Sequence, residues 1–115
     1  MTPAEVELLP KVAEVVGWSD DFPMHWTGAG WTGTRDASSG KLTAGSTTRH
    51  MSHDYMSDRM ARRIADWIDG QGLRYEREAA VGNDCMVWID DQFNVGSTRL
   101  EAEMRAVLAW KEANP

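Results

Sequence analysis

Five arginines lie close together in the middle of this sequence. Arginine is well suited to phosphate groups because its guanidinium presents a planar set of donors. Acidic side chains interleave with these arginines, however, and alternating charges on a helix are typical of a solvated, ion-paired face. Two hypotheses stay open: a site for a phosphorylated or nucleotide ligand, or an ion-paired surface. The arginines are Arg59, Arg62, Arg63, Arg74 and Arg77.

The histidines and the single cysteine do not have the spacing of a metal site. His50 and His53 are arranged as H-x-x-H, whereas His25 and Cys85 lie far from them in the sequence. A structural zinc site needs four nitrogen or sulfur ligands in closely spaced pairs. We therefore expect no metal ion and no other cofactor, and we interpret the histidine pair as part of a solvated loop before a helix.

Two pairs of neighbouring carboxylates are the candidates for acid–base chemistry. Asp20-Asp21 and Asp90-Asp91 both fall in expected turns, where aspartate is common because its side chain bonds the local backbone. Cys85 stands in an apolar stretch and is expected to be a buried, unreactive thiol. We therefore expect a protein that is not an enzyme. An enzyme with an unrecognised arrangement of groups is the alternative.

Tryptophan is unusually frequent, with six in 115 residues. Trp26 and Trp31 lie in an irregular segment at about 19–53 that is rich in Gly, Ser and Thr. Tryptophan is enriched at binding hot spots, so these two either anchor a partner or cover a small core. The spacing of apolar residues places Trp67 and Trp88 in the core, Trp18 at the end of the first helix and Trp110 at a helix margin.

The charge of the chain favours a basic partner. Twelve Lys and Arg against 18 Asp and Glu give a formal net charge of −6. A general nucleic-acid binder usually carries a basic patch, so that class is disfavoured. Together with the tryptophans, the acidic turns predict a surface for a protein or ribonucleoprotein complex that is itself basic. Its residues are Asp20, Asp21, Trp26, Trp31, Asp84, Asp90 and Asp91.

The length predicts one domain over 1–115, with a core large enough to need no disulfide. No apolar run is long enough to span a membrane, and the acidic N-terminus is unlike a signal peptide. A single cysteine fits a reducing, cytoplasmic environment. A homodimer is an alternative that sequence periodicity does not test.

Capping residues and apolar spacing predict three helices. Thr2 and Glu5 form a capping box for a first helix that ends at Gly17, with a kink or restart at Pro10. A second helix is expected over about 57–69, capped by Asp54 or Ser57 and stopped by Gly70 and Gly72. Thr98 and Glu101 form a second capping box. The helix that follows should bury Leu100, Met104, Val107 and Leu108.

Alternating apolar residues predict antiparallel strands between the second and third helices. The strands are expected at 73–79, 85–89 and 93–95, joined by a type II′ turn at Gly82-Asn83 and a polar turn at Asp90-Asp91. The middle strand is apolar on both faces, so it should be central or covered on both sides. A further short hairpin would pair 24–27 with 30–35 or with 41–43. The prediction is an α+β fold, an α-β-α sandwich in which a small antiparallel sheet of 2–4 strands packs with three helices.

Three stretches of the chain resemble the phage ABA sandwich domain family of small bacteriophage and prophage proteins. Residues 8–18 are similar to the opening helix and Gly-Trp of that family, 53–64 to its entry into a central helix, and 97–108 to its closing helix. The chain departs from the family at Asp54, where Pro is frequent, and over 19–50, which has no counterpart. The resemblance implies a phage or prophage origin and the sandwich fold, and it implies no catalytic residues.

Small acidic phage proteins without enzyme motifs commonly bind host machinery. The resemblance therefore favours a protein that acts by protein–protein interaction, as a counter-defence inhibitor of a host bacterial complex such as a CRISPR effector. A binder or sponge of a nucleotide at the arginine cluster is one alternative. A virion or assembly accessory protein is another.

Overall fold

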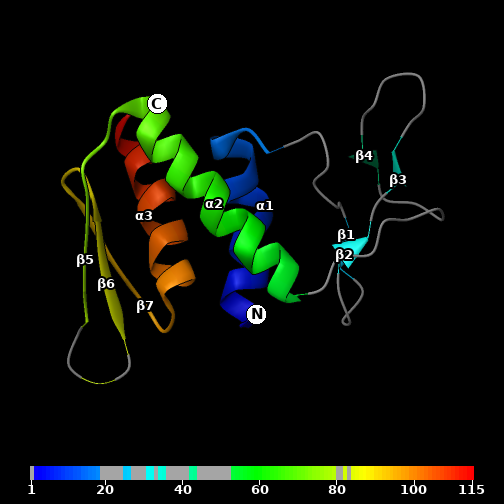
Figure 1. The fold of residues 1–115 in the computed structure, drawn as a ribbon, viewed down its shortest axis with the longest axis horizontal. Coiled ribbons are helices and arrows are strands. Elements are labelled where there is room, and N and C mark those ends of the chain that lie inside the picture. The colour runs from blue at the N-terminus through cyan, green and yellow to red at the C-terminus, as the bar shows by residue number, and fades with distance from the viewer. Residues whose placement is uncertain are drawn as a thin grey trace.

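The computed structural model describes residues 2–18, 53–79, 82 and 84–115, and the backbone of four two-residue strands between 25 and 43. Side chains of the second helix are described from Met56 onwards. The elements in chain order (Figure 1) are α1 Pro3–Val16, β1 His25–Trp26, β2 Trp31–Thr32, β3 Thr34–Arg35, β4 Leu42–Thr43, α2 His53–Gln71, β5 Tyr75–Ala79, β6 Cys85–Ile89, β7 Gln92–Gly96 and α3 Arg99–Ala113.

Helix α1 follows its sequence signals closely. The Thr2 hydroxyl accepts the N–H of Glu5 at 3.2 Å, and the Glu5 carboxylate accepts the N–H of Thr2 at 2.8 Å, so the capping box is complete. The helix continues across Pro10 and does not restart there. Gly17 ends it with a φ of 79°, a left-handed conformation that glycine adopts at little cost.

Helix α2 is longer than the expected 57–69, because it begins at His53 and reaches Gln71. Asp54 and Ser57 therefore lie inside the helix, and the expectation that one of them caps it is wrong. Gly70 is also helical, so the chain turns only at Gly72, which has a φ of 68°. The N–H of the next residue returns to the carbonyl of Ile68, which closes the helix end.

The sheet is β5-β6-β7, antiparallel throughout, and β6 is its central strand as expected. The pairing of Ala79 with Cys85 centres the first connection on Gly82, whose φ is 92°. The expected two-residue turn at Gly82-Asn83 is therefore wrong by one register position. Ile89 pairs with Gln92, so the second turn is confirmed, and it consists of two aspartates.

The short hairpin expected in the first half is present in the backbone. Strand β1 pairs with β2 and β3 pairs with β4, both antiparallel. The first of the two expected pairings, 24–27 with 30–35, is thus the one that forms, while 41–43 meets the end of the 30–35 stretch. Asp20, Asp21 and His50 lie outside the described residues, as do the side chains of His25, Trp26, Trp31 and His53.

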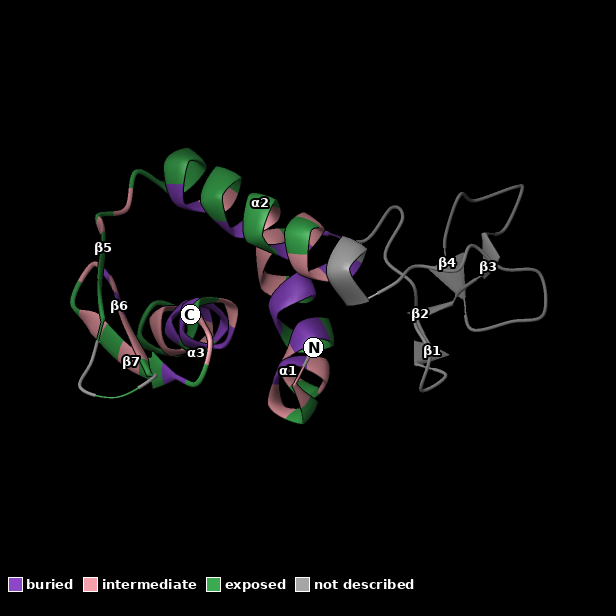
Figure 2. Ribbon diagram, turned by 60° about the horizontal axis from the view of Figure 1, so that its bottom comes forward, coloured by how far each residue is buried: buried purple, intermediate pink, exposed green. Residues whose placement is uncertain are grey.

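Helix α3 lies between the sheet and the pair formed by α1 and α2 (Figures 1 and 2). The α+β class with three helices and an antiparallel sheet is confirmed. Within that class the sheet is an outer layer, because α3 covers its inner face while α1 and α2 pack on the far side of α3. At the start of α3 the Thr98 hydroxyl accepts the N–H of Glu101 at 3.1 Å. The Glu101 carboxylate bonds the N–H of Ser97, one residue before the position that a complete capping box requires.

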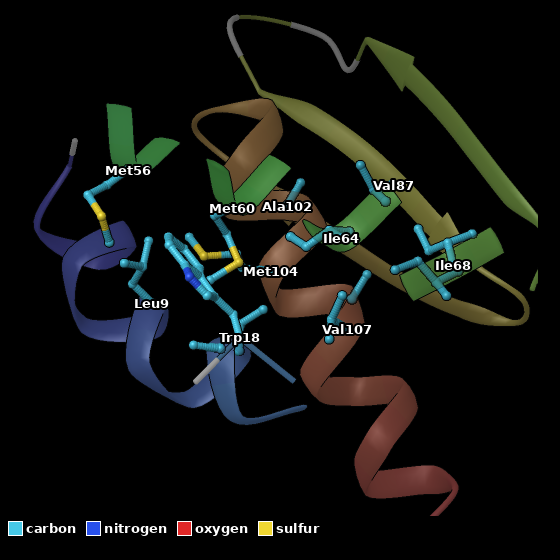
Figure 3. Packing of buried hydrophobic residues seen from close by; sticks show 14 residues of the cluster. Leu9, Trp18, Met56, Met60, Ile64, Ile68, Val87, Ala102, Met104 and Val107 are labelled. Carbon is cyan, nitrogen blue, oxygen red and sulfur yellow. The ribbon is translucent and has the colours of Figure 1, made fainter. Parts of the chain in front are cut away.

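The core forms where these layers meet (Figure 3). Trp18 is buried and its ring lies near Leu9, Met60 and Met104. Of the four residues expected to form the buried stripe of α3, Met104 and Val107 are fully buried and the other two are half-buried against the core. Trp67 packs on the core as expected and meets Trp110 edge-on, with ring centroids 5.1 Å apart. In the described segments, no helix is long and apolar enough to cross a membrane.

A substitution at Gly96 tests the close contact between β7 and the start of α3. A Cβ there would lie 2.5 Å from the backbone nitrogen of Ala102 and 2.9 Å from Cβ of Glu101. We expect Gly96→Ala to lower the free energy of unfolding by about 1–3 kcal/mol, because the start of α3 must shift to make room. Urea denaturation measures the change.

Gly70→Ala is the matched control. This position is helical, and an added Cβ meets nothing within 4 Å. The same substitution should stabilise here by about 0.5–1 kcal/mol, because alanine has the better helix propensity. Equal effects at both glycines would contradict the close packing described for Gly96.

Candidate functional site

The outer face of the sheet carries apolar side chains that no described residue covers. Because side chains alternate along a strand, Met86 and Trp88 of β6 share this face with Val95 and Phe93 of β7, their register partners. The Trp88 and Phe93 rings lie 4.9 Å apart. Phe93 is 48% exposed and Val95 is 40% exposed. Trp88 belongs to this face, so its expected place in the core is wrong.

Acidic side chains border this apolar face on the β5 side. Glu76 pairs with Trp88 and Glu78 with Met86, so both glutamates stand on the same face as the aromatic residues. Both are exposed. The face therefore combines an apolar centre with a negative edge. We call it the outer sheet face, meaning Met86, Trp88, Phe93, Val95, Glu76 and Glu78.

A groove opens on the other side of β5, between α1, α2 and the first turns of α3. Its volume is about 570 Å³, within the range of small-molecule sites. Apolar side chains and charged side chains share its walls. The lining residues are Glu5, Ser57, Asp58, Ala61, Arg62, Ala65, Ile68, Asp69, Tyr75, Arg99, Leu100 and Glu103.

A buried carboxylate organises one wall of this groove. Oε1 of Glu103 accepts a hydrogen bond from the Tyr75 hydroxyl at 2.9 Å and from Nε of Arg99 at 2.6 Å. Glu103 is 5% exposed, so its charge requires these partners to stay in the interior. The three side chains join the start of β5 to the first turns of α3.

The same contacts change the acidity of the tyrosine. Burial raises the pKa of Tyr75 above its ordinary value of 10.0, and the negative charge of Glu103 raises it further. Both effects favour the neutral phenol, which is the form that donates the hydrogen bond. The bond to Glu103 likewise raises the pKa of Arg99, so this side chain keeps its charge.

The structure does not bring the five arginines into one site. Arg59 and Arg63 lie over the Trp18 ring, with guanidinium carbons 5.8 and 5.7 Å from its centroid. Arg62 lines the groove. Arg77 is exposed on β5, and Arg74 is exposed just before it. The backbone of Arg74 forms hydrogen bonds with Asp90.

The expected acidic and aromatic residues are also distributed over several places. Asp84 is exposed before β6, and Asp91 is exposed in the β6–β7 turn. Asp90, with a φ of 53°, accepts the N–H of Arg74 at 2.9 Å, which gives it a structural role in the turn. The backbones of Trp26 and Trp31 are register partners in the β1–β2 hairpin.

The exposed face of the sheet and the buried carboxylate in the groove wall do not follow from the spacing of residues in the sequence. The alternation of Phe93 and Val95 was visible, and so was the four-residue spacing of Arg99 and Glu103. Neither pattern says which face of a strand stays uncovered or which charged residue is buried. The signal for the outer sheet face is the apolar character of β6 on both faces, which predicts a strand that is central or covered on both sides. Strand β6 is central, but no described helix covers its outer face.

The described residues contain no group of three or more His, Cys, Asp and Glu that could hold a metal ion. Cys85 is half-buried at the start of β6 and packs against the core. No family model matches this chain, and neither a curated protein nor a solved structure is detectably similar to it. The resemblance to phage ABA sandwich proteins therefore stays a prediction.

The buried hydrogen bond of Tyr75 predicts a stability change with pH. A group whose pKa is raised in the folded state contributes stability that is present below its unfolded pKa, about 10, and that is lost as the pH rises through the folded pKa. We expect Tyr75→Phe to destabilise the protein by about 1–2 kcal/mol at neutral pH, because Glu103 loses a donor.

The measurement is urea denaturation of both proteins from neutral pH to above pH 10. The gap in stability between wild type and Tyr75→Phe should narrow above about pH 10, where the wild type loses the contribution that the variant lacks. A gap that is constant over this range would show that the hydroxyl makes no such bond.

Proposed function

We propose that this protein acts by binding another protein through the outer sheet face. The observation that carries the proposal is the exposure of Phe93 and Val95 beside Trp88, in a sheet whose other face is packed against α3. Large exposed apolar side chains that are contiguous and bordered by polar ones are typical of interaction sites. Tryptophan is among the residues that most often dominate binding energy.

The charge around this face selects the kind of partner. Glu76 and Glu78 stand beside the aromatic pair, and the whole chain has a net charge of −6. Two copies packed face to face would bring four of these carboxylates together, and like charges at an interface are costly. A basic partner gains from the same arrangement, so we favour a basic surface over a homodimer.

A host complex is the specific partner that we favour. Protein surfaces that bind nucleic acid are basic, so a ribonucleoprotein complex offers the complementary charge. The resemblance to phage ABA sandwich proteins supports a counter-defence inhibitor of such a complex, acting in the cytoplasm of a bacterial host without chemistry of its own.

Removing the apolar centre should abolish binding without unfolding the protein. We expect Phe93→Ser combined with Val95→Ser to stay within about 1.5 kcal/mol of the wild-type free energy of unfolding, since both side chains are exposed. Affinity purification from the cell that makes the protein, followed by mass spectrometry, identifies bound proteins. A partner that wild type retains and the folded double variant loses supports the proposal. Equal retention by both proteins contradicts it.

Reversing the charge beside this face should slow association with that partner. Glu76→Lys with Glu78→Lys and the control Glu7→Lys with Glu14→Lys both change the net charge by +4, from −6 to −2, at exposed positions. We expect the first pair to lower the association rate about tenfold at low salt and the α1 pair to lower it much less. Equal slowing by the two pairs would indicate that the association rate depends on the electrostatic field of the whole protein and not on the outer sheet face.

A further inference from the structure

The groove bordered by α1, α2 and α3 is lined by more acidic than basic side chains among the described residues. In the part of the chain that the structure describes, four carboxylates line it, on Glu5, Asp58, Asp69 and Glu103, against the two guanidinium groups of Arg62 and Arg99. Their sum is −4 + 2, or −2. A groove with a negative balance and low-dielectric walls concentrates cations.

Two of these carboxylates are buried and only partly satisfied. Glu5 and Glu103 are each 5% exposed. Oε1 of Glu5 accepts the N–H of Thr2, and Oε1 of Glu103 takes both the Tyr75 and the Arg99 donors. Among the described residues, no hydrogen bond reaches Oε2 of either side chain. Both residues line the groove.

Apolar side chains lie between the charged ones. Ala61 and Ala65 are exposed on one side of α2, with Leu100 of α3 and Ile68 also lining the groove. Small side chains leave room for an alkyl chain, and burying each methylene there is worth about 0.8 kcal/mol. A ligand that matches the groove therefore has a cationic head for the carboxylates and an apolar stem.

We infer that the groove binds an alkylammonium group, with its nitrogen at the second oxygens of Glu5 and Glu103 and its stem over Ala61 and Ala65. An ammonium has three donors, which suits carboxylate oxygens that lack a partner. The stem explains why alanines line a groove that is otherwise charged. Two sources supply this chemistry: a small free amine, or the side chain of a lysine in a partner. The inference does not depend on the outer sheet face.

The test is an NMR titration of the amide signals of the whole protein with defined probes. Putrescine represents the free amine, a capped lysine amide represents the side chain, and 1-butanol is a neutral stem without the charge. We expect an amine to shift the signals of Glu5, Ala61, Ala65 and Glu103 with a dissociation constant below about 1 mM, and 1-butanol to bind at least tenfold more weakly. Both amines binding alike identifies a lysine side chain as a sufficient ligand, and tighter putrescine identifies the free amine.

Two matched pairs of variants distinguish binding of the amine in the groove from its general attraction to an acidic protein. Glu5→Gln with Asp69→Asn removes two groove charges, while Glu7→Gln with Asp66→Asn removes two exposed charges of the same helices outside the groove. Glutamine keeps the capping bond of α1. The first pair should weaken amine binding about tenfold and the second less than twofold.

A variant that fills the groove gives an independent check. Ala65→Phe leaves every charge in place but occupies the space over α2, so it should abolish the amine-induced shifts. Three outcomes overturn the inference: no shifts with either amine at about 10 mM, equal weakening by the two charge pairs, or undiminished binding to folded Ala65→Phe. None of these outcomes alters the test of the outer sheet face, because the residues are different.

Discussion

The burial of α3 on two opposite sides is the constraint on which the rest of this structure depends. The helix packs against the sheet and against α1 and α2, so acidic residues near its start lie in the interior. A buried carboxylate persists only with donors around it. Glu101 therefore bonds the N–H of Ser97, and Glu103 binds Tyr75 and Arg99. These bonds fix where β5 and β7 meet the helix, which explains why Gly96 has no room for a side chain.

The same constraint decides what remains uncovered. With α3 on the inner face of the sheet and the other two helices beyond it, no described helix is left for the outer face. Strand β6 nevertheless has apolar residues on both faces, with Val87 in the core and Trp88 outside it. A strand apolar on both sides usually lies within a covered sheet. The exposure of Phe93 and Val95 thus follows from the layer order, and it is the reason to assign a partner to this face.

Signals between residues that are neighbours in sequence predicted the helices and turns well. Strand register and the burial of side chains depend on tertiary packing, and they were predicted less well. The capping box at Thr2 and Glu5 and the turn at Asp90 are decided by residues that are neighbours in sequence, and both appear as expected. The register around Gly82 depends on which strand positions face α3, so the turn chemistry alone was misleading. Periodicity placed Trp88 on a strand face without saying which face the helix would cover.

Charged residues were the hardest to place, because a sequence gives spacing but not burial. Arg59 and Arg62 look alike in sequence, yet a rotation of about 60° around α2 sends one over Trp18 and the other to the groove. Strand β5 shows the same principle at closer range. Tyr75 lines the groove, and the next residue, Glu76, borders the outer sheet face. One strand thus forms a wall of both surfaces. Its alternate side chains separate the two surfaces, so the exposed Glu76 and Glu78 can be changed on the outer sheet face without altering a residue that lines the groove.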